Sequence, residues 1–300
     1  TAVGYSAGIQ VTTGTHNTLI GGDAGDAITT GLSNVAIGYN ALSTEDAHGL
    51  NTAVGYSALA TLNAGADGYN VAVGYRAGTA MNTGLYNTLL GADAGRLITT
   101  GGRNVAIGLQ ALDANTTGSK SIAIGVNALG TQNPATATNM NNIAIGDSSG
   151  SVLSTGTANT LIGSGAAVAL TTGLDNVALG MDAAQDMTIG RFNIAIGTQA
   201  LGNETIGDRS VAIGYQSGYY QVSDSNNEEA QNVYAGMYSG HYNVTGKFNT
   251  AIGYQALMGN STNSADSNVA IGRNAGLLCR GGNNTLVGAL AGDAITTGDT

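Results

Sequence analysis

The chain has 300 residues, of which 48 are glycine, 42% are hydrophobic and 9% are charged, and its formal net charge is −10. An acidic chain repels nucleic acid and anionic membranes, so we expect no nucleic-acid partner; no apolar run approaches the roughly 18 residues of a membrane span, so we expect no membrane insertion. Because the single cysteine, Cys279, cannot close a disulfide within the chain, stability must come from packing.

The predicted elements along the chain all come from one phrase, which reads Asn-Thr-Leu-Ile-Gly at residues 17–21 and occurs with small variations seventeen times. Ten of the fifteen spacings between visible repeat starts are 17 residues, and the others are 16, 19, 19, 21 and 22. A period this short and persistent is typical of a solenoid whose coils contact only their neighbours. We expect an all-β parallel solenoid of about seventeen 17-residue coils, which forms a single domain over residues 1–300 and is a fragment of a longer fibrous protein. The phrase closes at Gly4, Gly21, Gly38, Gly55, Gly74, Gly91, Gly108, Gly125, Gly146, Gly163, Gly180, Gly197, Gly214, Gly236, Gly253, Gly272 and Gly288.

Each repeat, numbered from its asparagine, predicts one short strand followed by a sharp corner. Position 1 is Asn in fourteen of sixteen repeats, which indicates either a ladder of stacked Asn side chains or a turn in which Asn bonds its own backbone. Positions 2 and 4 are nearly always β-branched or aliphatic, as in residues 18–20 and 35–37, which predicts strands that bury these two positions. Position 5 is always Gly, which suits a positive φ or a close backbone approach, and position 8 is always Ala or Ser, which indicates a site with little room.

Positions 9 and 12 exchange volume along the repeats. A Leu at position 9 accompanies a polar residue at position 12, as in Leu42 and Glu45, whereas a small residue accompanies an apolar one, as in Gly25 and Ile28. We infer that one large apolar side chain fills one slot in each coil, because two would overpack it and none would leave a cavity. Cys279 occupies the same slot, so we interpret its thiol as a buried packing group rather than a reactive one.

Position 3 is coupled to position 6. Leu19 at position 3 precedes Gly22 at position 6, whereas Ala36 precedes Tyr39. Position 3 lies on the opposite strand face from positions 2 and 4, so the sequence predicts an apolar column outside the coil that is too long to be left exposed. An identical chain is its simplest cover. The residues expected at this interface are Ala36, Tyr39, Ala53, Tyr56, Leu89, Ala106 and Ala195.

The repeats resemble those of a known family. Residues 34–38 read Asn-Val-Ala-Ile-Gly and residues 210–214 read Ser-Val-Ala-Ile-Gly, similar to the Asn-Ser-Val-Ala-Ile-Gly repeat of YadA-like trimeric autotransporter adhesin heads. This resemblance covers the whole chain and implies a left-handed parallel β-roll, three identical chains wound about one axis, and binding to host-surface or matrix components. The dominant period is longer than is usual in that family, and repeats such as residues 249–257 are similar to those of bacteriophage tail fibres.

The sequence offers little for catalysis. His16, His48 and His241 lie in different coils and are not spaced with Cys, Asp or Glu as a metal cluster or a catalytic triad requires. Asp23 and Asp26 fall in a phrase similar to a calcium-binding repeat, but the spacing differs, and solvated turn carboxylates are the simpler interpretation. We therefore expect no enzyme activity, no cofactor and no metal.

The 22-residue coil is the predicted contact surface. It contains the acidic loop 223–229, and six of the thirteen tyrosines fall between Tyr215 and Tyr242. Aromatic faces beside Asp and Asn are typical of sugar binding, and the alternative is that these rings fill space between chains. The candidate contact residues are Tyr219, Tyr220, Asp224, Asn226, Glu228, Glu229, Tyr238, His241 and Tyr242.

Two function classes follow from these observations. We favour the structural shaft of a bacteriophage tail fibre, located on the virion, which carries or contributes to host-surface attachment. The alternative is the head domain of a bacterial trimeric surface adhesin, located at the cell surface, which binds host or matrix components. In both classes the expected partners are the chain itself, as a homotrimer, and a host cell-surface glycan or protein.

Overall fold

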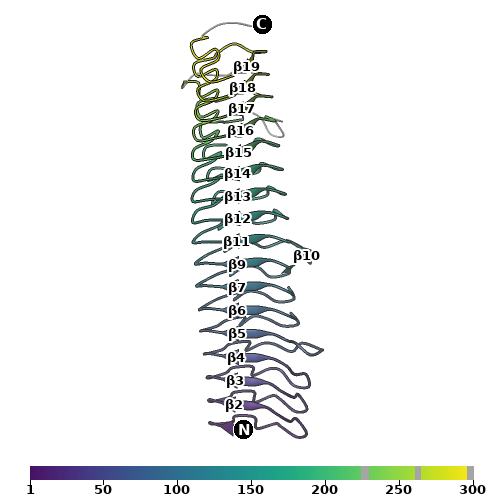
Figure 1. The fold of residues 1–300 in the computed structure, drawn as a ribbon. Helices are drawn as coiled ribbons and strands as arrows, with labels where there is room; N and C mark the ends of the chain where they lie inside the picture. Colours follow the sequence, from purple (N-terminus) through teal and green to yellow (C-terminus); the bar gives the residue numbers. More distant parts are fainter. Residues whose placement is uncertain (224–229, 261–264, 296–300) are drawn as a thin grey trace. The chain divides into compact units, whose positions relative to one another are not determined.

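The computed structural model describes residues 1–223, 230–260 and 265–295, and over these residues every regular element is a β-strand. The chain divides into two compact units, residues 1–155 and 156–300. In each unit, the short strand of one coil stacks in parallel on the strand of the next coil (Figure 1). The prediction of an all-β parallel solenoid with a spacing near 17 residues is therefore confirmed.

In the first unit, successive coils pair in register, so that position 3 of one coil lies opposite position 3 of the next, as in Leu19, Ala36 and Ala53. A smaller sheet joins β8 (Gly118–Ser119) and β10 (Thr138–Asn139) outside the main one. The strands of the main sheet are β1 (Ala2–Val3), β2 (Thr18–Ile20), β3 (Val35–Ile37), β4 (Thr52–Val54), β5 (Val71–Val73), β6 (Thr88–Leu90), β7 (Val105–Ile107), β9 (Ile122–Ile124) and β11 (Ile143–Ile145).

The second unit repeats this arrangement in its own stack, where Ala178, Ala195 and Ala212 lie opposite one another in consecutive coils. The register persists across the longer spacing between β15 and β16, where Ala212 lies opposite Tyr234. The strands are β12 (Thr160–Ile162), β13 (Val177–Leu179), β14 (Ile194–Ile196), β15 (Val211–Ile213), β16 (Val233–Ala235), β17 (Thr250–Ile252), β18 (Val269–Ile271) and β19 (Thr285–Val287).

The glycine at position 5 is required for two reasons. Its φ lies between 124° and 142° in every repeat, a region that only glycine enters freely. A Cβ on Gly38 would also lie 2.4 Å from the carbonyl oxygen of Gly55 in the next coil. The corner and the close approach predicted from the sequence therefore occur together at one residue.

The asparagine at position 1 forms the predicted ladder. Asn17 Oδ1 accepts a hydrogen bond from the backbone amide of Asn34 at 2.9 Å, and Asn34 Oδ1 accepts one from the amide of Asn51 at 3.1 Å. The other end of the side chain closes its own coil, since Asn17 Nδ2 donates to the carbonyl oxygen of Gly31 at 2.8 Å. Each buried asparagine therefore links two coils and fixes one turn.

The two faces of each strand are the reverse of those predicted from the sequence. Position 3 points into the coil, while positions 2 and 4 are half-buried or exposed on the outer face. A coil this slim accommodates one inward side chain per strand, and alanine fits where a pair of β-branched residues would overpack. The position 3 residues that were predicted to face a second chain are therefore corrected to the interior of one chain, where they have no exposed surface: Ala36, Ala53, Leu89, Ala106 and Ala195.

Position 6 is the part of the predicted interface that does lie outside the coil. Tyr39 and Tyr56 are 53% and 49% exposed. Their rings stack with centroids 5.6 Å apart, and Tyr56 stacks in turn on Tyr75 at 5.4 Å. Beside them the outward residues of β2 and β6 are also apolar, with Ile20 38% and Leu90 45% exposed. The outer strand face therefore presents an apolar column in a single chain.

The partner of position 3 in the exchange of volume is position 9 rather than position 6. A Cβ on Gly25 would lie 2.7 Å from Leu19 Cδ2, and one on Gly8, at position 9 of the preceding coil, would lie 2.6 Å from Leu19 Cδ1. Tyr234 fits in the same way between Gly218 and Gly240. A large residue at position 3 is therefore accommodated by small residues at position 9 on both sides of it.

The slot shared by positions 9 and 12 is present as predicted. Leu42 and Glu45 are both fully buried, and the Glu45 carboxylate accepts hydrogen bonds from the backbone amides of His48 and Ala64, each at 3.1 Å. Where the large apolar side chain of the slot stands at position 9, a polar residue at position 12 can therefore accept hydrogen bonds from backbone amides of the turn. Cys279 lies fully buried in this slot, and burial raises the pKa of its thiol, as expected for a packing group.

Candidate functional site

The structure assembles part of the predicted contact surface as an aromatic cluster in the second unit, where the chain leaves β15 and β16. Equivalent positions of these two coils stack on each other. Tyr219 lies on His241 with ring centroids 5.7 Å apart, and Tyr220 lies on Tyr242 with centroids 4.9 Å apart. The backbone sets this register, because the Tyr220 amide donates to the carbonyl oxygen of His241 at 2.9 Å. The four rings therefore form two stacked pairs.

His241 is the centre of the cluster. The rings of Tyr220, Tyr238 and Tyr242 meet it edge-on, with centroids 4.5 to 5.2 Å from its own. Its Nδ1 lies 3.0 Å from the carbonyl oxygen of Gln216, so Nδ1 carries the proton that makes this hydrogen bond. Only 5% of the residue is exposed, and burial lowers the pKa of the imidazole. A neutral histidine thus anchors the tyrosines.

The exposed part of the cluster consists of ring edges and hydroxyl groups. Tyr220 is 37% exposed, and Tyr219 and Tyr242 are half-buried. Because the faces of these rings stack on one another, the cluster offers phenol hydroxyls rather than an open aromatic platform. The remaining predicted contact residues lie outside the described part of the chain: Asp224, Asn226, Glu228 and Glu229.

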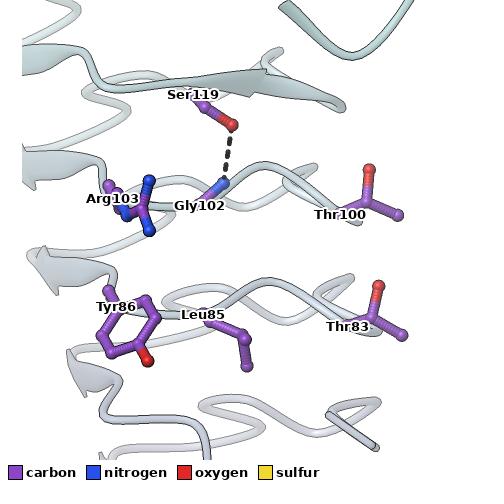
Figure 2. Close-up of a pocket in the computed structure, with 7 residues that line it drawn as sticks. All are labelled: Thr83, Leu85, Tyr86, Thr100, Gly102, Arg103 and Ser119. Carbon is purple, nitrogen blue, oxygen red and sulfur yellow. Dashed lines mark hydrogen bonds between the residues drawn. The ribbon is translucent and has the colours of Figure 1, made fainter. Parts of the chain in front are cut away.

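A second candidate site, a lateral pocket of about 230 Å³, lies in the first unit (Figure 2). Three successive coils build it, at the turns that lead into β6, β7 and β9. Leu85, Gly102 and Ser119 occupy the same position of these coils, two residues before position 1. Gly102 has no side chain to fill the space between its neighbours, and its amide donates to Ser119 Oγ at 3.0 Å. The hollow therefore lies where a glycine stands between two coils that carry a side chain at this position.

Aromatic and cationic side chains form one wall of this pocket, which we call the lateral pocket. Tyr86 stacks on Tyr69 with centroids 5.5 Å apart, and the Arg103 guanidinium lies over the other face of Tyr86 at 5.8 Å. These residues occupy the position just before the ladder asparagine, and Lys120 occupies it in the next coil. Tyr86 and Arg103 have positive φ values of 62° and 59°. This row therefore carries two tyrosines followed by two cations, of which Tyr86 and Arg103 line the pocket.

In the part of the chain that the structure describes, Arg103 and Lys120 form no ion pair, whereas Arg76, Arg96 and Arg191 each pair with an aspartate. The hydroxyls of Thr83 and Thr100 line the pocket opposite Arg103 (Figure 2). The lateral pocket thus combines a cation, hydroxyl groups and apolar surface. Sequence analysis missed it, although the cations at equivalent positions of neighbouring repeats were visible.

A third group consists of Glu45, Asp46 and His48, whose potential ligand atoms lie within 4.8 Å of one another. The spacing argument from the sequence missed this group as well. Both carboxylate oxygens of Glu45 already accept backbone amides, and His48 Nδ1 lies 3.5 Å from Glu45 Oε1. The arrangement is accounted for by the turn that it holds together.

Comparisons with protein-family models and with curated proteins give no match for this chain. In the described part of the chain, no helix is of a length and apolarity that would cross a membrane.

Proposed function

We propose that the chain is the structural shaft of a fibre, a homotrimeric left-handed β-roll that holds a receptor-binding element away from a bacteriophage virion. It acts as a scaffold rather than as an enzyme. The observation that carries the proposal is the apolar column on the outer strand face, where Tyr39, Tyr56 and Leu90 are about half exposed in a single chain. A column that recurs in every coil requires a cover with the same period, and an identical chain has that period by construction.

The corrected strand faces change which residues would meet between chains. We place positions 2, 4 and 6 at the interface, because they face outward, position 4 is aliphatic in nearly every coil and position 6 is often tyrosine. Position 3 stays in the interior of each chain. Stacked strands and shared backbone hydrogen bonds suit a shaft that must resist proteases outside a cell. The sequence resemblance to tail-fibre and adhesin repeats supports an exterior location and a trimer.

The oligomeric state tests this proposal. We expect light scattering to give the mass of three chains for the purified protein. Leu90→Asp places a charge on the outer column and should shift the mass to that of a monomer. Asn82→Asp, an exposed turn residue outside the column, is the matched control and should leave the trimer intact. A stable folded monomer of the unmodified chain would refute the trimer.

A second candidate function, the head of a bacterial trimeric surface adhesin, is favoured by the aromatic cluster. Tyr220 and Tyr242 present hydroxyls and ring edges at a site where the acidic loop 223–229 also begins. A glycan array probed with the purified chain and with a chain lacking residues 223–229 separates the two functions. Binding that is lost with the deletion favours the adhesin, whereas an array without binding favours the shaft.

A further inference from the structure

We propose that the lateral pocket binds a carboxylate-bearing sugar, such as a uronic acid unit of an acidic polysaccharide. The proposal rests on the pocket between Tyr86, Arg103 and Ser119, which one chain forms by itself. The sugar-binding proposal is therefore independent of the proposed trimeric shaft, and either proposal can fail without affecting the other.

The charge of the pocket lining favours an anionic ligand. The chain has 19 acidic and 9 basic residues, so two cations at equivalent positions of adjacent coils form an uncommon local positive charge in it. Arg103 and Lys120 are both exposed, occupy equivalent positions of adjacent coils, and have no ion pair within the described residues. Adjacent strands lie about 4.8 Å apart, so Lys120 is one coil spacing beyond Arg103, which is the cation that lines the pocket. An anion is the ligand that this pair fits.

The shape of the Arg103 side chain favours a carboxylate among anions. A guanidinium offers a planar fork of donors that matches a carboxylate with two parallel hydrogen bonds. The Arg103 guanidinium lies over the Tyr86 ring at 5.8 Å, and this contact limits the orientations of its plane. Pre-orientation lowers the entropy that is lost when a ligand binds. A carboxylate therefore suits this wall better than a spherical anion.

The remaining lining favours a sugar over a simple acid. Thr83 and Thr100 present hydroxyls that have no side-chain hydrogen bond within the described residues, and both line the pocket. Leu85 and the edge of Tyr86 supply apolar surface, which suits the C–H groups of a sugar ring. The volume of about 230 Å³ lies below the usual range for drug-sized ligands, so it fits a single ring of a longer chain.

Titration calorimetry with trigalacturonic acid and with its methyl ester tests the assignment. The ester keeps the ring and the hydroxyls but removes the charge. We expect the unmodified protein to bind the acid and to bind the ester at least about tenfold more weakly, the loss typical of one charge-assisted pair. Arg103→Gln should weaken binding of the acid by about the same factor, and Thr100→Val should weaken binding of both compounds.

Arg209→Gln is the matched control, since Arg209 lies over Phe192 at 5.7 Å in the second unit, at the same position of its coil. It should leave binding unchanged. Equal binding of acid and ester, no binding of the acid, or unaltered binding by Arg103→Gln would each overturn the proposal. If Arg103→Gln fails to fold, Lys120→Gln and Thr100→Val take its place, and unaltered binding by both would overturn it equally.

Discussion

Asn87 Oδ1 accepts a hydrogen bond from the backbone amide of Asn104 at 3.0 Å, one coil further along the chain. The same side chain donates through Nδ2 to the carbonyl oxygen of Gly101 at 3.0 Å, within its own coil. Both asparagines have no exposed surface, so water cannot replace either bond. One buried amide group thus satisfies a donor in one coil and an acceptor in another, which explains why the repeat begins with asparagine.

Replacing Asn87 by Ala should destabilise the first unit by about 2 to 4 kcal/mol, because it leaves a buried amide and a buried carbonyl without partners. Urea denaturation measures the change, and hydrogen exchange should show faster exchange of the Asn104 amide. Asn82→Ala, an exposed turn residue, serves as the control and should change the free energy of unfolding by less than about 0.5 kcal/mol. Equal effects of the two substitutions would contradict the ladder as a source of stability.

The glycine corner provides the second prediction. A Cβ on Gly108 would lie 2.5 Å from the carbonyl oxygen of Gly125, and Gly108 has a φ of 130°. Gly108→Ala should therefore destabilise the unit by more than about 3 kcal/mol, since backbone strain and a clash between coils add. Gly65 also has a positive φ, 68°, but a Cβ there would meet nothing within 4 Å. Gly65→Ala should cost only about 1 kcal/mol. Thermal unfolding that ranked the two in the opposite order would disprove this account.

Periodicity is enough to predict the solenoid, the parallel pairing, the asparagine ladder and the glycine corner, because each depends on a residue type that recurs at one position. The face of the strand was not predictable in this way. Both faces carry apolar residues, and the rule that larger residues face inward favoured Val35 and Ile37 over Ala36. The coil is too slim for that rule, and its interior accepts alanine instead.

Of the two candidate sites, the aromatic cluster could be predicted from the sequence and the lateral pocket could not. Clustering of Tyr219, Tyr220 and Tyr242 could be predicted, because the positions match between neighbouring coils. The lateral pocket could not, since it depends on the absence of a side chain at Gly102 between Leu85 and Ser119. A gap between three coils has no signature within any one repeat. It becomes visible only when the repeats are aligned in space.

The third prediction concerns the coupling of positions 3 and 9. Ala106 and Leu112 are fully buried at these positions in one coil, and Leu19 with Gly25 shows the alternative arrangement. Ala106→Leu alone should overpack the interior and cost about 1 to 3 kcal/mol. Leu112→Gly alone should leave a cavity and cost about 2 to 5 kcal/mol, partly offset because Leu112 has a φ of 55° that glycine tolerates better.

The double variant Ala106→Leu with Leu112→Gly should be more stable than the sum of the two changes predicts, by at least about 1 kcal/mol, because the new leucine fills the cavity left by the old one. Urea denaturation of the four proteins completes the cycle. The comparison is a second double variant, Ala106→Leu with Leu129→Gly, in which Leu129 is the position 9 residue of the next coil. Its coupling free energy should differ from that of the first pair. Changes that add within about 0.5 kcal/mol in the first pair would rule out the exchange of volume.

The fourth prediction is a dependence of stability on pH that originates at His241. Burial lowers the pKa of this imidazole below the ordinary value of 6.5. In the pH range between the two values, the unfolded chain binds a proton that the folded chain does not, so protonation favours unfolding. The contribution of His241 to stability is therefore complete above pH 6.5 and decreases as the pH falls, by at most about 1.4 kcal/mol for each pH unit.

His241→Gln removes the titration but keeps a donor that can reach the carbonyl oxygen of Gln216. Because carboxylates titrate in both proteins, the difference between them isolates the histidine. Urea denaturation at pH 7.5 and at pH 5 should show that the wild-type chain loses more stability on acidification than the variant does. His16→Gln, at an exposed histidine of the first unit, should leave the wild-type dependence in place. If His241→Gln retained that dependence, or if the wild-type chain became more stable at pH 5, the buried neutral histidine could not be its source.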